Sequence, residues 1–223
     1  MTPVVAIRPE PGGSDTARAG ATIGLEIENV PLFEARSIAW ELPGGALDGL
    51  LVGSANVFRH SGSNLARLQT IPVHCVGGAT AAAASAAGFT VATQGSGGLQ
   101  DVIDKLAPQR LLRLAGKERV ELALPDGMIM ETCVVYEVAP LPIPMPLAAR
   151  LAESNAIVLL HSAKAAEHFA SECSRLRLDR ARMTLAALGP RIAQAAGGGW
   201  AAVHSAPQPS DAALLEMVRD MCH

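Results

Sequence analysis

A glycine turn that opens an alanine-rich segment, VGGATAAAASAAG at residues 76–88, is the first candidate for chemistry in this chain. Glycine lets an anion approach the free backbone N–H groups at the start of a helix, so such a turn can bind phosphate or carboxylate. Gly77 and Gly78 are adjacent, whereas a dinucleotide fingerprint needs G-x-G-x-x-G. The Gly-Lys pair at 116–117 lacks the Ser or Thr of a P-loop. A nucleotide-dependent enzyme is therefore disfavoured, and an ordinary strand-to-helix turn is the structural alternative.

Other kinds of site lack their motifs. No G-x-S-x-G nucleophile motif is present, so acyl-transfer chemistry is not supported. The six histidines have no regular metal-ligand spacing, and we expect no metal site. The cysteines, at 75, 133, 173 and 222, form no C-x-x-C pair and are expected to be free thiols in a reducing cytoplasm.

Composition narrows the class of protein further. The 223 residues are 49% hydrophobic and 17% charged, which is typical of a compact soluble protein with one large domain or two small ones. A net charge of −3 and 3% aromatic residues argue against nucleic acid or an anionic membrane as a partner. The apolar run before Arg8 is too short for a signal peptide or a membrane span, so we expect a cytoplasmic protein.

Short aliphatic runs alternate with helical segments along the chain, which predicts βαβ units and parallel sheets. The predicted strands are 3–7, 25–30, 49–52, 73–76, 110–114, 156–160 and 185–188. A final amphipathic helix is predicted at 211–222. Two stretches interrupt this alternation: an extended segment near 31–38, and CVVYEVAPLPIPMP at 133–146, whose proline cluster is typical of a linker.

An internal echo indicates two α/β halves of similar build. LVGSANV at 51–57 corresponds to LLHSAKA at 159–165, and the glycine turn at 76–88 corresponds to LGPRIAQAAGGG at 188–199.

The positions of the extended stretches then divide the chain. We expect an inserted α/β domain at 38–134, a discontinuous α/β domain from 1–34 and 142–223, and linkers near 31–38 and 134–142. Both domains would contain parallel sheets, and two linkers would join them with a cleft between.

An ordered set of motifs supports a family assignment. The motifs are Arg8-Pro9 after the first strand, LLVGSANVFRHSG, VHCVGGATAAAASAAGF, LLRLAGKERV, VVYEVAP, VLLHSAKAAEHFA, LAALGPRIAQAAGGGW and APQPSDAALLEMV. In their order and spacing, over nearly the whole chain, they resemble the uroporphyrinogen-III synthases.

The resemblance implies a monomeric, cofactor-free enzyme of tetrapyrrole (heme) biosynthesis, with two α/β domains joined by a two-stranded linker. Its substrate would be the linear tetrapyrrole hydroxymethylbilane, which family members close into uroporphyrinogen III with inversion of ring D and release of water. The implied route runs through loss of the hydroxyl, an azafulvene cation and a spirocyclic pyrrolenine. Because the substrate carries acetate and propionate arms, the glycine turn is interpreted as a carboxylate cradle.

Tyr136 is the only tyrosine of the chain and matches the tyrosine of the family's V-Y motif. Our hypothesis is that it hydrogen-bonds or protonates the departing hydroxyl, as a phenol can. The alternative is an amphipathic side chain that packs at a domain junction.

Eight further residues are predicted to bind the substrate through their side chains or backbone amides. They are Arg8, Ser54, Asn56, Gly78, Thr80, Lys117, Ser162 and Arg191. The hydroxyl and amide side chains could equally cap helices, and the cations could be solvated surface charges.

Three positions depart from the family pattern. Arg191 stands where a threonine pair is more frequent, His161 replaces a commoner hydroxyl residue, and Ala163 replaces a frequent proline. These departures keep open a second class of function, a non-catalytic two-domain binding protein for a small anionic ligand.

Overall fold

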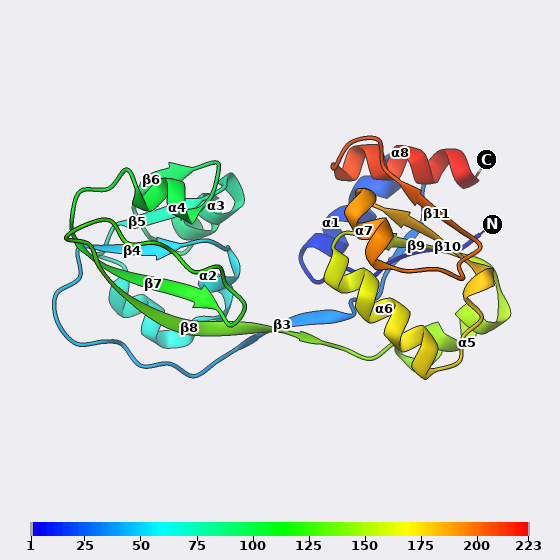
Figure 1. The fold of residues 1–223 in the computed structure, drawn as a ribbon, viewed down its shortest axis with the longest axis horizontal. Coiled ribbons are helices and arrows are strands. Elements are labelled where there is room, and N and C mark those ends of the chain that lie inside the picture. Colours follow the sequence, from blue (N-terminus) through cyan, green and yellow to red (C-terminus); the bar gives the residue numbers. More distant parts are fainter. Residues whose placement is uncertain (1, 223) are drawn as a thin grey trace. The chain divides into compact units, whose positions relative to one another are not determined.

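The computed structural model describes residues 2–222, which form two compact units (Figure 1). Unit 1 joins Met1–Glu34 with Pro140–His223, and unit 2 is Ala35–Ala139. Each unit contains its own sheet, and most of the strand pairs in the two sheets are parallel. The predicted α/β class, with one domain discontinuous in sequence, is confirmed. Within residues 2–222, no helix is long and apolar enough to cross a membrane.

The sheet of unit 1 combines strands from both ends of the chain. Its five strands are, in spatial order, β11 (Ala202–Ser205), β10 (Met183–Ala187), β9 (Ala156–Leu160), β1 (Val4–Ala6) and β2 (Ile27–Asn29). β1 pairs with β9, so the N-terminal strand is hydrogen-bonded to a strand about 150 residues later. All five residues of β9 are buried, as expected for the central strand of a sheet covered on both faces.

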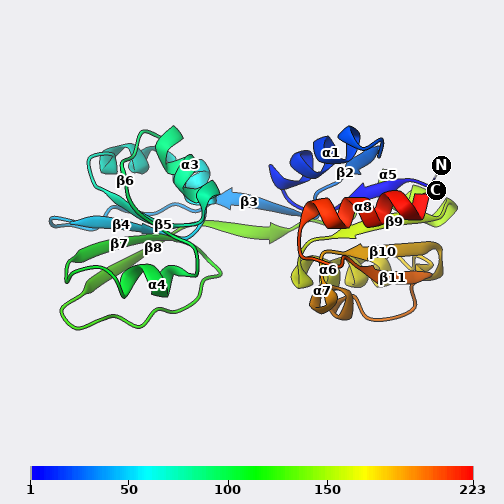
Figure 2. The same cartoon turned by 90° about the horizontal axis from the view of Figure 1, so that it is seen from above.

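Helices cover both faces of this sheet (Figure 2). They are α1 (Gly12–Thr22), α5 (Met145–Glu153), α6 (Ala163–Arg175), α7 (Pro190–Ala195) and α8 (Asp211–Cys222), with a short 3-10 turn η2 (Arg180–Arg182). The apolar stripe Leu214, Leu215 and Val218 of α8 packs on Ala6 and Leu159 of the sheet, which confirms the predicted amphipathic helix.

The sheet of unit 2 has six strands. In spatial order they are β3 (Phe33–Ser37), β8 (Ile129–Pro140), β7 (Arg110–Gly116), β4 (Gly49–Val52), β5 (Val73–Val76) and β6 (Val91–Gly95). One face is covered by α2 (Asn56–His60), η1 (Gly62–Leu68) and α3 (Gly78–Ala86), and the other by α4 (Leu99–Ile103). Successive side chains of β4 point to opposite faces of the sheet. Leu50 and Val52 therefore pack in the core on the α2 and α3 face, and Leu51 packs in the core on the α4 face.

The two sheets share one topology. Without β3, the order β6-β5-β4-β7-β8 of unit 2 repeats the order β11-β10-β9-β1-β2 of unit 1. The motif at 51–57 therefore begins in β4, and its echo at 159–165 begins in the equivalent strand β9. The units differ in chain order, because the strands equivalent to β7 and β8 come first in unit 1.

The second interrupting stretch was expected to be extended, with a linker near 134–142. Most of the segment 133–146 lies in β8, which pairs with β7 from Ile129 to Tyr136. The β-branched and aromatic residues of this segment favour a strand. Its last residues begin α5, because proline is tolerated in the first turn of a helix.

Leu51 tests the role of β4 in the core. Its side chain is fully buried, so Leu51→Ala should lower the free energy of unfolding by about 2–5 kcal/mol. Urea unfolding can be followed through Trp40, which packs on the core of unit 2, in a Trp200→Phe background. The exposed Leu124 is the control, since Leu124→Ala should change stability by no more than about 0.5 kcal/mol. Equal effects of both substitutions would contradict this packing.

Candidate functional site

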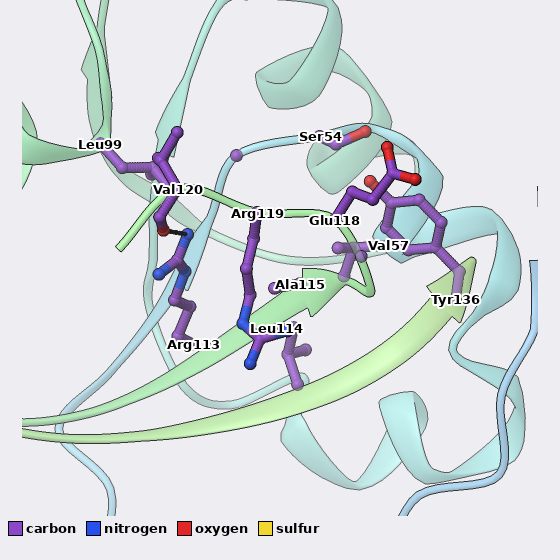
Figure 3. Close-up of a pocket in the computed structure, with 12 residues that line it drawn as sticks. Ser54, Val57, Leu99, Arg113, Leu114, Ala115, Glu118, Arg119, Val120 and Tyr136 are labelled. Carbon is purple, nitrogen blue, oxygen red and sulfur yellow. Dashed lines mark hydrogen bonds between the residues drawn. The ribbon is translucent and has the colours of Figure 1, made fainter. Parts of the chain in front are cut away.

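The carboxyl ends of β4 and β7 meet at the point where the strand order of unit 2 reverses. After β4 the chain forms β5 on one side of this strand pair, and after β7 it forms β8 on the other side. In open α/β sheets, ligands bind at such a topological switch point. A pocket of about 170 Å³ lies there, lined by residues that follow β4, by β7 and the loop after it, and by Tyr136 of β8 (Figure 3).

One end of this pocket carries hydroxyl and carboxyl groups. Figure 3 shows the hydroxyl of Ser54, the carboxylate of Glu118 and the phenol of Tyr136 pointing toward one another. The Tyr136 residue is only 8% exposed, and its ring belongs to the core of unit 2. Tyr136 therefore has the packing role of the structural alternative while it also lines the pocket.

Gly116 makes room for this placement of the tyrosine ring. A Cβ atom on Gly116 would lie 2.7 Å from Cζ and 2.9 Å from the hydroxyl oxygen of Tyr136. Real Cβ atoms do not approach other heavy atoms so closely. The backbone of the next residue also fixes the strand, since Lys117 N–H donates to the carbonyl of Tyr136 at 2.9 Å.

The other end of the pocket is basic. Arg113 lies in β7 with only 4% of its surface exposed, and its Nη2 donates to the carbonyl of Val120 at 2.8 Å. Arg119 follows in the exposed loop. Burial lowers the pKa of the Arg113 guanidinium, and the like charge of Arg119 lowers it further.

The predicted residues of unit 2 fall into two groups. Ser54 and Tyr136 line the pocket. Asn56 starts α2 and Gly78 starts α3, while Lys117 Nζ lies 3.0 Å from Glu137 Oε2. The lining of this pocket does not include these three, nor the 5% exposed Thr80 in α3.

In unit 1, Arg8 lies in a polar cluster just after β1. Its Nη1 is 2.8 Å from Asp211 Oδ2 and 3.0 Å from the hydroxyl of Thr16. The His161 side chain, after β9, is 6% exposed, and its Nε2 lies 3.1 Å from Asp211 Oδ1 without hydrogen-bond alignment. β9 and β1 form the switch point of this sheet, so the cluster occupies the place in unit 1 that the pocket occupies in unit 2.

The remaining predicted residues of unit 1 follow β9 and β10. Ser162 caps α6, because its hydroxyl accepts a hydrogen bond from Ala165 N–H at 3.1 Å. Arg191 is exposed on α7, and no ion pair of the described residues includes it. All three predicted residues of unit 1, Arg8 included, therefore lie beyond the carboxyl ends of neighbouring strands.

Sequence reasoning missed three charged residues of the pocket: Arg113, Glu118 and Arg119. One signal was available for Arg113, since a cation in the middle of the aliphatic run RLLRLAG is unusual in a buried strand. Over residues 2–222, no group of three or more His, Cys, Asp or Glu could hold a metal ion.

Comparison with known proteins identifies the family. The model of the family described as Uroporphyrinogen-III synthase HemD matches residues 14–216. The chain belongs to the uroporphyrinogen-III synthase family.

Among solved structures, the family member uroporphyrinogen-III synthetase from Helicobacter pylori aligns with a TM-score of 0.69 and 19% identity, over 99% of this chain and 100% of that one. A mutant uroporphyrinogen III synthase from Thermus thermophilus aligns with a TM-score of 0.49 and 16% identity, over 99% of both chains. The first likeness supports the fold. A comparison with curated proteins gives no match.

Gly116→Ala tests the placement of Tyr136 in this family member. The added methyl group must displace the ring, so the ring signal of ¹³C-labelled tyrosine, which arises from one residue, should shift and broaden. Gly98 is a matched control, since a Cβ there meets no atom within 4 Å and its φ of −164° suits any residue. A ring signal unchanged by Gly116→Ala would contradict the described contact.

His161 should make stability depend on pH. Burial, and secondarily the charge of Arg8, lowers its pKa from 6.5 to about 4, against the opposing effect of Asp211. The unfolded chain therefore binds the proton more tightly, and this contribution is present above pH 6.5 and lost as pH falls toward 4. The loss should reach about 3 kcal/mol.

Chemical unfolding of wild type and His161→Gln across pH 4–7 measures this contribution. The difference between their unfolding free energies should change with pH in the stated direction. Parallel profiles would show that His161 titrates normally.

Proposed function

We propose that this chain converts hydroxymethylbilane into uroporphyrinogen III, with inversion of ring D and release of water. The observation that carries the proposal is the pocket at the switch point of unit 2 in a member of this family, with the phenol of Tyr136 among its lining groups. Ser54 and Glu118 accompany it. These groups can act on a departing hydroxyl and on the cation that it leaves behind.

Loss of the hydroxyl is the step that needs a proton. The phenol of Tyr136 donates a hydrogen bond or a proton to the leaving oxygen, and the C–O bond breaks to release water. The remaining azafulvene carries positive charge, which the carboxylate of Glu118 stabilises electrostatically. The substituted carbon of ring D bonds to the azafulvene carbon and gives the spirocyclic pyrrolenine. The bond from that ring D carbon to its original bridging carbon then breaks, and the bridging carbon bonds to the free α-carbon of ring D, which inverts the ring. The hydrogen that this α-carbon loses balances the proton supplied at the start.

Binding of the carboxylate arms positions the reacting rings. The residues predicted from the sequence would bind these arms through hydroxyls, backbone amides and cations, among them Ser54, Gly78, Lys117, Ser162 and Arg191. Arg8, Asn56 and Thr80 belong to the same proposed set. Such contacts make ring inversion a matter of orientation and of exclusion of water, rather than of strong acids or bases.

The enzyme is proposed to act as a monomer in the cytoplasm. It would need no cofactor, because the chemistry requires only proton transfer and positioning.

The distribution of product isomers tests the proposed activity. Purified protein is incubated with hydroxymethylbilane, and the oxidised products are separated into type I and type III uroporphyrins. Predominantly type III supports the proposal, because unassisted closure yields type I. Type I alone would replace it with the non-catalytic binding protein for a small anionic ligand.

Tyr136→Phe removes only the hydroxyl oxygen and keeps the ring in the core. We expect kcat for the type III product to fall about 10²–10⁴-fold, as for loss of an acid–base group, with little change in KM. Initial rates of type III formation, corrected for the reaction without enzyme, measure the effect. Unchanged turnover would assign Tyr136 to packing alone.

A further inference from the structure

Arg113 is a buried cation with few partners. The residue is 4% exposed, its Nε is buried without a hydrogen-bond partner, and one bond joins its Nη2 to the Val120 carbonyl. No ion pair among the described residues includes Arg113 or Arg119. Burial of a charge without a counter-ion costs free energy. An anion bound in the pocket beside Arg113 would offset this cost.

The geometry of the pocket agrees with an anion from outside the chain. Arg113 and Arg119 line one end, and Figure 3 shows the Glu118 carboxylate at the other end, beside Ser54 and Tyr136. The volume of about 170 Å³ leaves room for a small polar group such as the end of a carboxylate arm.

We propose that Arg113 and Arg119 form a binding site for one carboxylate arm of the substrate. This inference rests on the proposed function for the identity of the arm. The planar guanidinium of Arg113 suits a carboxylate in two-pronged geometry, which lysine cannot reproduce. An arm held at this end directs the pyrrole ring that carries it toward Ser54, Glu118 and Tyr136, where the hydroxyl departs.

The site would act mainly on binding and orientation. Arg113 lies within the sheet and Arg119 in the exposed loop after it, so the loop can admit the arm and the strand can hold it. The two cations should contribute unequally, because the buried charge acts in a lower dielectric than the exposed one.

A direct test uses the full chain, uniformly ¹⁵N-labelled and with ¹³C-labelled tyrosine. The probe is a monopyrrole with one acetate and one propionate arm, and its neutral dimethyl ester is the control ligand. The Nε–H signal of Arg113, assigned by its loss in Arg113→Met, should shift saturably with the acid and not with the ester. Inorganic phosphate is the third ligand tested. A shift of the Arg113 signal with phosphate and none with the monopyrrole would overturn the carboxylate assignment.

Variants then give the size of the effect. Arg113→Met should weaken binding of the acid about 10–100-fold, as followed at the Tyr136 ring signal. Arg113→Lys keeps the charge but should weaken binding of the acid about 10-fold, since lysine lacks the paired N–H donors of the guanidinium. Arg119→Met should weaken binding less than Arg113→Met does. Arg67→Met removes an exposed arginine of the same unit and should leave binding unchanged.

Folding and activity are controlled separately. Arg113→Met removes an unpaired buried charge, so its melting temperature should not fall; if that variant does not fold, the wild-type Nε–H shift and Arg113→Lys decide. An Arg113 signal that ignores the acid would overturn the site even if wild type makes type III product. An Arg113 site that binds the acid in a protein making only type I product would uphold the site and reject the proposed function.

Discussion

β4 and β7 lie side by side at the centre of the sheet of unit 2, and their fixed register determines what reaches its carboxyl edge. Leu51 pairs with Arg113 and Val52 with Leu114, and all of these residues are buried. Both strands must keep this register, because a slip by one residue would exchange the side chains of the two cores. Ser54, two residues after β4, and Gly116, the last residue of β7, are thereby brought to one pocket. A rigid pair of core strands thus positions groups that act on a ligand.

Much of the fold was predictable from local patterns. The β4, β5 and β9 runs are short, aliphatic and followed by turn residues, and their predicted bounds agree with the structure. The echo between 51–57 and 159–165 indicated two similar halves, which the shared strand order confirms. The segment 133–146 was predicted to be extended, and most of it lies in β8. Its closing prolines concealed the start of α5, because proline is compatible with the first turn of a helix.

The pocket was less predictable, because it depends on strand order. Tyr136 and Ser54 were identified from motifs, and the structure places both at the pocket. Glu118 and Arg119 lie in a loop without periodicity, and only the adjacency of β4 and β7 brings that loop to the site. In unit 1 the Arg8 side chain is paired with Asp211, a partner about 200 residues away that spacing alone could not reveal.

The central claim is that the substrate reacts beside Tyr136 at the switch point of unit 2. Its most direct test is the ¹³C ring signal of this single tyrosine, recorded with a linear tetrapyrrole that lacks the departing hydroxyl and so binds without turnover. The account predicts a saturable shift of that signal. An unchanged signal in a protein that forms type III product would place the chemistry elsewhere and contradict the account.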